Sequence, residues 1–274
     1  MPAYFWVRVS HYAADVPAFN QTFRLRCIVV LISTSAFSLG CCGHQSNQLE
    51  NAAPSVADQF RHRTGDLVFQ DLDCGPLCDA IEAVTGGVGG CDISHMGMVV
   101  ERRTVVEHDA SHEVLQQSDA HWFVLEALSP TVRLVPLSNF LSRSLDAVGR
   151  PKVIVGRLRS TNVPQISDAV AVGLKYLDTP YDERFLMGDD ALYCSELIYL
   201  IFKDGATGSP LFPLAPMTFR SPQTGVYFPV WVDYFAELGV PIPEGAVGTN
   251  PAAISCSPVL RIVYRYGQLD CSHP

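Results

Sequence analysis

The chain has 274 residues and a formal net charge of −9 at pH 7. This length allows one large domain or two small ones, and the acidic balance argues against nucleic acid as a partner, since nucleic-acid binding calls for a basic surface. Hydrophobic residues make up 48% of the chain and charged residues only 17%, so the sequence has ample material for a core.

The N-terminal part of the chain has the pattern of an export signal. Arg24 and Arg26 form a short basic flank. An apolar run follows from Cys27 to Leu39 and ends at Gly40-Cys41-Cys42. Basic, apolar and small residues in this order are typical of a signal peptide, and the run is too short for a comfortable membrane span. We therefore predict an exported protein of the cell envelope or periplasm.

The cysteines at the end of this run leave the processing open. They resemble a bacterial lipoprotein signal, which would anchor the protein to the membrane through Cys41 or Cys42. Such signals usually carry an aliphatic residue three places before the cysteine, where Cys41 has Ser38 and Cys42 has Leu39. The alternative is a plain secretory signal or an uncleaved anchor. We assign 1–42 to an N-terminal extension with this signal, 43–63 to a polar tether and 64–274 to the folded domain.

The sequence of the domain predicts several strands and a few separate helices. Strand-like stretches follow one another at 67–69, 95–101, 122–127, 132–137, 152–158 and 259–264. Helical spacing of apolar residues occurs at 77–84, 165–177, 194–202 and 232–238. Because the helices do not alternate regularly with the strands, this order indicates an α+β fold rather than a βαβ fold.

Nine cysteines suggest disulfides in an oxidising compartment. Cys256 and Cys271 could close a C-terminal loop, and two of Cys74, Cys78 and Cys91 could pair, which would leave Cys194 as the reactive thiol. A zinc site at Cys74, Cys78 and Cys91 lacks a fourth ligand, and His108-x3-His112 is better explained as a solvated turn. We therefore predict neither a metal nor a cofactor.

Cys194 stands at the start of a predicted apolar helix. Unpaired backbone N–H groups and the positive end of the helix dipole favour a thiolate at such a position. A thiolate is the reactive form of cysteine, so Cys194 is a candidate nucleophile. The alternative is an ordinary buried thiol, since free cysteine is among the most buried residue types.

A thiol nucleophile needs a base and a group that orients the base. His95 begins a predicted strand, and the small Gly97 two residues later leaves room for its imidazole. Glu126 lies in an otherwise apolar strand and should have a partner, because burying a carboxylate alone is costly. If the two strands are neighbours, His95 and Glu126 can meet. The alternative is that Glu126 faces solvent from an edge strand.

Five motifs in order resemble a known family. They are Gly65-Asp66-Leu-Val-Phe69, Ser94-His95-Met-Gly97-Met-Val-Val100, Leu125-Glu126-Ala127, Pro180-Tyr181-Asp182 and Tyr193-Cys194-Ser195-Glu196-Leu197. Together they look like the YiiX/YaeF-type permuted papain-like hydrolases of the NlpC/P60 superfamily, in which the histidine strand precedes the cysteine helix. The resemblance covers 64–202 and leaves 203–274 as a C-terminal extension.

The resemblance implies a fold and a set of roles. The fold would be a circularly permuted papain-like one, with an antiparallel sheet or small barrel packed against the nucleophile helix. Cys194 would be the nucleophile, His95 the base and Glu126 the orienting residue. Tyr181 and Tyr193 would lie near the site and contact the substrate.

These roles predict a thiol hydrolase that cleaves an amide bond through an acyl-enzyme. For an exported member, the resemblance suggests a peptide or isopeptide bond, as in cell-wall peptides or peptidoglycan fragments. One alternative is a lipid-directed acyltransferase or thioesterase, which an apolar groove would favour over the polar, charged cleft of a peptidase. Another is a ligand-binding module that keeps the fold without catalysis.

Overall fold

The computed structural model describes residues 60–102, 121–159, 165–188, 190–205 and 209–272. These residues belong to one compact unit. The predicted export signal, most of the tether and His108-x3-His112 lie outside the described residues. None of the described helices has both the length and the hydropathy to cross a membrane.

The predicted strands form one antiparallel sheet of six, in the order β4-β3-β2-β1-β5-β8. The strands are β1 (Leu67–Gln70), β2 (His95–Arg102), β3 (His121–Leu128), β4 (Thr131–Pro136), β5 (Val153–Leu158) and β8 (Leu260–Arg265). Neighbours in the chain pair with each other from β1 to β4, so β2 and β3, which carry His95 and Glu126, lie side by side. The α+β architecture expected from the sequence is confirmed.

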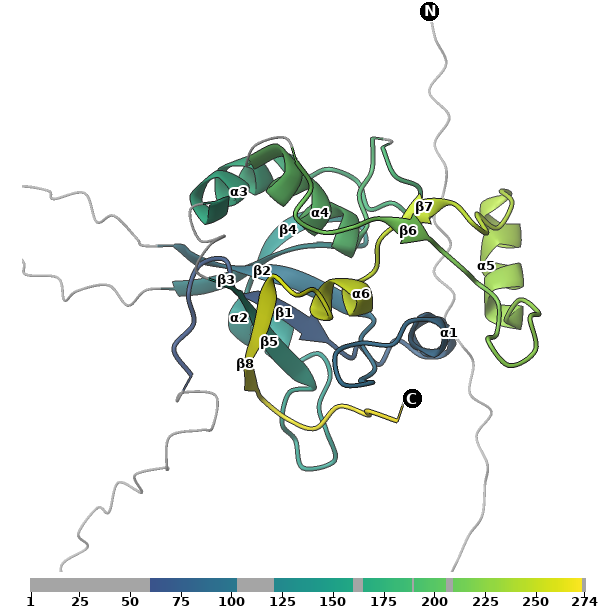
Figure 1. The fold of residues 1–274 in the computed structure, drawn as a ribbon, viewed down its shortest axis with the longest axis horizontal. Coiled ribbons are helices and arrows are strands. Elements are labelled where there is room, and N and C mark those ends of the chain that lie inside the picture. Colours follow the sequence, from purple (N-terminus) through teal and green to yellow (C-terminus); the bar gives the residue numbers. More distant parts are fainter. Residues whose placement is uncertain (1–59, 103–120, 160–164, 189, 206–208, 273–274) are drawn as a thin grey trace, which may run out of the picture. The chain divides into compact units, whose positions relative to one another are not determined.

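The helices lie around this sheet (Figure 1). They are α1 (Pro76–Val84), α2 (Leu137–Leu141), α3 (Ile166–Gly173) with its continuation η3 (Leu174–Tyr176), α4 (Cys194–Gly205), α5 (Pro229–Leu238) and α6 (Pro251–Ser255). The four helices expected from apolar spacing are all present. Two short helices, α2 and α6, and the small strand pair β6 (Ala215–Pro216) and β7 (Val247–Gly248) were not expected.

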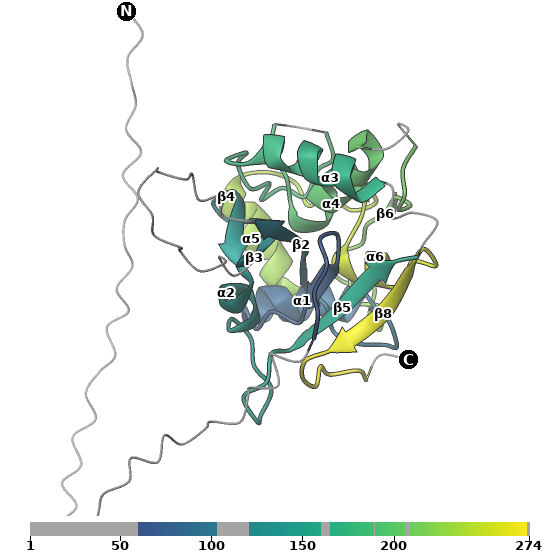
Figure 2. The same cartoon turned by 90° about the vertical axis from the view of Figure 1, so that its left-hand side faces the viewer.

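The two faces of the sheet are covered by different helices. One face carries Met96, Met98 and Leu125, which pack in one hydrophobic cluster with Leu197 and Ile201 of α4. Figures 1 and 2 show α3 beside α4 on this side of the sheet. The alternate residues of the strands face the other way, where a second cluster includes α2. This alternation is the usual consequence of the two-residue period of a strand.

Two disulfides join the described cysteines. Cys74 pairs with Cys78, as one of the expected possibilities, and Cys91 pairs with Cys271. The expected pairing of Cys256 with Cys271 is wrong, and Cys256 is a free, exposed thiol. Cys271 pairs with Cys91 because the C-terminal tail runs back past the loop before β2, where the backbone of Asp92 donates to the carbonyl of Asp270.

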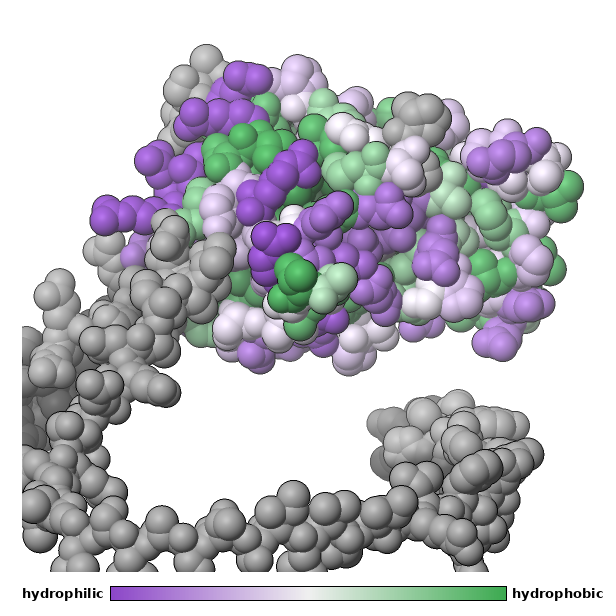
Figure 3. Space-filling model, turned by 90° about the horizontal axis from the view of Figure 1, so that it is seen from below, coloured by the Kyte–Doolittle hydropathy of each residue, from purple (hydrophilic) through white to green (hydrophobic). Residues whose placement is uncertain are grey.

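Most of the large apolar side chains are inside the domain. On the face seen in Figure 3, hydrophilic residues gather near the centre and hydrophobic ones form smaller patches among them. The exposed large hydrophobic side chains come from separate elements and loops, namely Leu145, Val148, Leu174, Val226, Val232 and Val247. In the described ranges, the large apolar side chains therefore serve mainly the core.

Candidate active site

His95 is the first residue of β2 and lies opposite Gln70 of β1. Its side chain is almost fully buried, and its Nε2 lies 2.9 Å from Oε2 of Glu126 on the neighbouring strand β3. The ring of Phe140 from α2 stacks on the imidazole, with 5.7 Å between ring centroids. The imidazole is thus held at one edge by a carboxylate and on one face by an aromatic ring.

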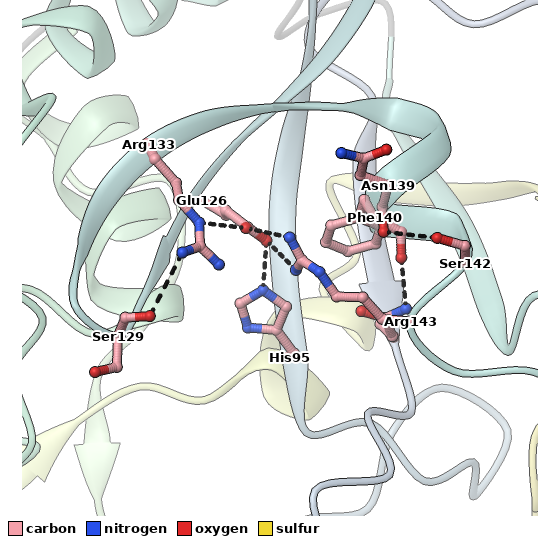
Figure 4. Close-up of polar contacts among 9 residues, drawn as sticks. His95, Glu126, Ser129, Arg133, Asn139, Phe140, Ser142 and Arg143 are labelled. Carbon is pink, nitrogen blue, oxygen red and sulfur yellow. Dashed lines mark hydrogen bonds and ion pairs between the residues drawn. The ribbon is translucent and has the colours of Figure 1, made fainter. Parts of the chain in front are cut away.

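Glu126 is a buried carboxylate with three partners (Figure 4). Arg143, in the turn after α2, binds both oxygens, with Nη1 2.6 Å from Oε2 and Nη2 2.6 Å from Oε1. Arg133 of β4 pairs with Glu126 across the sheet and donates from Nε to Oε1 at 3.1 Å. Since the side chain is 0% exposed, the alternative that Glu126 faces solvent is wrong.

The charge of Glu126 follows from these partners. Burial, the largest influence, raises the pKa of the carboxyl group, because a low-dielectric interior disfavours the charged form. Hydrogen bonds from His95 and Arg143 act in the opposite direction and lower the pKa to about 2. Glu126 is therefore ionised at neutral pH and accepts hydrogen bonds through both oxygens.

Gly97 allows β2 and β3 to approach each other beside the site. A Cβ at this position would lie 2.4 Å from Cγ1 of Val124 and 2.8 Å from the carbonyl oxygen of Leu125. It would also lie 3.3 Å from Cβ of Glu126. A glycine at this position is thus required by the close packing of β3, and it leaves the space through which Glu126 reaches His95.

Cys194 is the first residue of α4 and is 7% exposed. Burial lowers the pKa of His95, but hydrogen bonds with Cys194 and Glu126 outweigh it and raise this pKa to about 9. Nε2 of His95 faces Glu126, and the second ring nitrogen points away from the carboxylate in Figure 4. Nδ1 is therefore the nitrogen left for the thiol.

Cys194 and Glu126 both act on the pKa of His95, although α4 and α2 cover opposite faces of the sheet. His95 and Cys194 can be near each other because they are the first residues of β2 and α4. The structure thus brings the three predicted catalytic residues together. Their chemical roles stay predictions.

The two predicted substrate-binding tyrosines both line a cavity beside Cys194. The hydroxyl of Tyr193 accepts a hydrogen bond from the backbone N–H of Thr249 at 3.2 Å and donates to Sδ of Met187 at 3.1 Å, so it holds two loops in place. Burial, followed by the nearby Cys194, raises the pKa of Tyr181 well above its ordinary value. Tyr181 therefore keeps its proton and presents a neutral hydroxyl.

The cavity has a volume of about 150 Å³. Its walls come from α1, the segment 216–219, α5 and the beginning of α6. Most of the lining side chains are apolar or aromatic, among them Ile81, Val84, Phe185, Met217, Phe219 and Trp231. Within the described part of the chain, no charged side chain lines this cavity. It suits an apolar group, because a charged group placed there would lose its hydration without gaining a partner.

Several residues of the site were not found from the sequence. Arg133 lies in a strand that was expected, and its position as the only cation in that apolar stretch was an available signal. Phe140 and Arg143 belong to α2 and the following turn, where the spacing of Leu137, Phe140 and Leu141 is helical but only five residues long. The cavity walls formed by 216–251 carried no chemical motif.

In the described ranges, no group of three or more His, Cys, Asp or Glu side chains is placed to hold a metal ion. Cys74, Cys78 and Cys91 do not offer thiolates to a zinc ion, because all three sulfurs form disulfides. Both oxygens of Glu126 are already bound by arginines.

Comparisons with known proteins place the chain in a family. A family model described as permuted papain-like amidase enzyme, YaeF/YiiX, C92 family, matches residues 61–264. The uncharacterized protein YiiX of Escherichia coli (strain K12) is 27% identical over 207 residues, which cover 74% of this chain and 87% of the relative. A solved structure, described as the metalloprotein yiiX from Escherichia coli O157:H7, has a TM-score of 0.56 and 24% identity, and the match covers 75% of this chain and 98% of that one.

The likeness to the solved structure concerns the fold, and the family match extends the resemblance seen in the motifs. The family match continues past residue 202 to residue 264. It therefore includes α5 and α6, which form part of the cavity, and β8, which is the last strand of the sheet. The expected permuted papain-like fold is confirmed. The chain belongs to the permuted papain-like amidase family, YaeF/YiiX.

Proposed function

We propose that this chain is a thiol hydrolase that cleaves an amide bond, with Cys194 as nucleophile, His95 as general base and acid, and Glu126 as the residue that orients His95. The support for the proposal is the buried imidazole of His95, whose pKa is raised by both Cys194 and Glu126 and whose Nε2 lies 2.9 Å from the Glu126 carboxylate. A nucleophile, a base and a third orienting group in contact are the general signature of covalent catalysis.

The first half of the reaction forms an acyl-enzyme. Because Glu126 is ionised and can only accept, Nε2 of His95 carries a proton toward it, and Nδ1 takes the proton of the Cys194 thiol. The thiolate attacks the amide carbonyl carbon, and the carbonyl electron pair moves to the oxygen. The backbone N–H of Cys194 and the start of α4 stabilise this oxyanion. When the oxyanion collapses, the C–N bond breaks and the amine leaves with the proton from Nδ1.

The second half releases the acid. Nδ1 of His95, now neutral, takes a proton from water as the water oxygen attacks the thioester carbon. The tetrahedral intermediate collapses, the C–S bond breaks, and Cys194 leaves as the thiolate paired with the His95 imidazolium.

The cavity indicates which substrates fit. Apolar and aromatic side chains surround the space beside Cys194, so an apolar group next to the scissile carbonyl would be bound there. We infer an amide with an apolar acyl group or an apolar residue at this position. The acidic stem peptides of cell walls would need a cation, and none lines the described cavity. The same apolar lining favours the second candidate, a lipid-directed acyltransferase or thioesterase.

We further propose that the protein works outside the cytoplasm. The support is the pattern of residues 24–42, with lipidation at Cys41 or Cys42 and hence contact with a membrane. Globomycin blocks the peptidase that processes bacterial lipoproteins, and the drug should lead to accumulation of the precursor. Normal release of a soluble mature chain in its presence would leave only a secretory signal.

A substrate panel tests the proposed activity. It pairs amides and thioesters that carry the same acyl groups, either apolar or negatively charged, and follows turnover by the wild-type chain. The proposal predicts hydrolysis of apolar amides above that of charged ones. Turnover of thioesters alone would favour the lipid-directed alternative, and a lack of turnover on every substrate would favour a ligand-binding module.

A further inference from the structure

The helix α2 and the turn after it pack against His95 and Glu126. The guanidinium of Arg143 lies over the ring of Phe140, 5.3 Å from its centroid, and the same ring stacks on His95. The carbonyl oxygen of Phe140 accepts a hydrogen bond of 2.9 Å from Nε2 of Gln70, which lies opposite His95 in the sheet. The short helix α2 is therefore tied to the strand beside His95 and contacts the base through Phe140, and the turn after it contacts the orienting carboxylate through Arg143.

The acceptor capacity of Glu126 is filled in this arrangement. Its two oxygens have about four lone-pair sites, and they face four donors: Nε2 of His95, Nη1 and Nη2 of Arg143, and Nε of Arg133. Oε2 is shared by His95 and Arg143, and Oε1 by the two arginines. Rotation of the carboxylate about its bond to the side chain would break contacts on both oxygens at once.

We propose that Arg143 is a positioning residue of the active site, which holds the Glu126 carboxylate by a bidentate contact so that Oε2 stays on Nε2 of His95. This inference rests on the proposed function. Arg143 acts through Glu126 and His95 and does not touch the reacting atoms.

The two arginines differ in what they can do. Arg143 makes two parallel bonds of 2.6 Å and is 20% exposed, whereas Arg133 makes one bond of 3.1 Å and is 33% exposed. A bidentate pair fixes the plane of a carboxylate, and a single bond leaves rotation about it open. The geometry therefore assigns orientation to Arg143 and mainly charge to Arg133, which makes Arg133 the matched control.

The readout is the rate at which iodoacetamide alkylates Cys194 at pH 6, measured by mass spectrometry of the Cys194 peptide. This rate depends on the thiolate–imidazolium pair and needs no substrate. In Arg143→Ala, Glu126 no longer stays on His95 and the pair is less populated. We expect alkylation to slow by about tenfold, the effect of moving the pKa of the pair by one unit.

Two further variants separate orientation from charge and from folding. Arg143→Lys keeps the charge but lacks the planar fork, so it should regain only part of the lost rate. Methylguanidinium, added at concentrations that leave the melting temperature unchanged, should speed alkylation of Arg143→Ala toward the wild-type rate. Arg133→Ala should slow alkylation by less than about threefold, as expected for a single, partly exposed contact.

Wild-type alkylation rates in folded Arg143→Ala, or in Arg143→Lys, would overturn the inference. If Arg143→Ala does not fold, the Arg143→Lys rate decides, since that variant keeps the charge at the same place. Failure of the proposed function would look different: the wild-type chain would react quickly at pH 6 and hydrolyse no amide.

Discussion

The side chains on the two sides of Cys194 differ in charge. Toward α2, His95 and Glu126 lie in a buried network in which each charge has a partner. Toward α1 and α5, the thiol borders a cavity lined without charge in the described structure. Under the proposed function, the charged side would perform the chemistry and the apolar side would select the substrate. Changes on the first side should alter kcat and thiol reactivity, and changes on the second should alter KM.

The largest effect is expected where the two sides meet. Cys194→Ala removes the atom that attacks the carbonyl, so no acyl-enzyme forms and amide turnover should be abolished. The fold should survive, because alanine is well tolerated at the start of a helix. Turnover and a thermal melt, measured on the same preparation, check this. Turnover at the wild-type rate would refute the assignment of the nucleophile.

A change in the charged network should affect both activity and stability. Glu126→Gln leaves Arg133 and Arg143 without their carboxylate, and breaking a buried ion pair typically costs about 3 kcal/mol or more. Because the folded-state pKa of Glu126 is lowered from 4.5 to about 2, the carboxylate stabilises the fold above pH 4.5. This contribution is lost as pH falls through about 2.

The unfolding free energies of wild type and Glu126→Gln should therefore differ most near pH 7 and converge toward pH 2. Chemical denaturation at both pH values measures this. Activity should fall less than in Cys194→Ala, since the amide still hydrogen-bonds His95 but lacks the charge that stabilises the imidazolium. A pH-independent gap in stability would mean that the ionised carboxylate is not its source.

A charge placed in the cavity should act on substrate binding. Met217→Glu puts a carboxylate among the apolar lining and should raise KM for an apolar amide by about tenfold, the scale on which hydrophobic pockets discriminate. Alkylation of Cys194 at pH 6 should stay near the wild-type rate. The control is Val232→Glu, since Val232 is 48% exposed on α5 and lies outside the lining. Equal KM values in both variants would mean that the cavity does not bind the substrate.

The smallest effect concerns the alkaline limb of the pH profile. The pKa of His95 is raised from 6.5 to about 9, so the imidazolium persists through neutral pH and is lost as pH rises through about 9. Amide turnover needs that proton for the leaving amine and should decline there. Alkylation of Cys194 needs only the thiolate and should not decline. A fall of turnover near pH 7 would contradict this pKa.

The sequence was sufficient for the parts of the site that have local signals. Three residues had such signals: Cys194 begins a helix, His95 begins a strand, and Glu126 is a carboxylate in an otherwise apolar strand. The structure brings these three residues together. Arg143 could not be found in this way, because its contact depends on how a five-residue helix packs on the sheet. The pairing of Cys91 with Cys271 is likewise set by tertiary packing over a long separation.

The cavity also could not be predicted from local sequence signals. Its walls combine α1 with segments more than one hundred residues later, and apolar side chains such as Phe219 and Trp231 look like ordinary core residues in a sequence. The composition predicted a hydrophobic core, but it did not predict the position of the cavity. The residues around His95 and Cys194 were therefore easier to predict than the cavity beside them.

The most direct test of the account is to trap the acyl-enzyme. The wild-type chain is mixed with an anilide of a medium-chain fatty acid, quenched in acid within one turnover, and mapped by peptide mass spectrometry. We predict the acyl mass on the peptide that contains Cys194, none on the free and exposed Cys256, and none in Cys194→Ala. Turnover of the anilide without an adduct at Cys194, or with the adduct at Cys256, would contradict it.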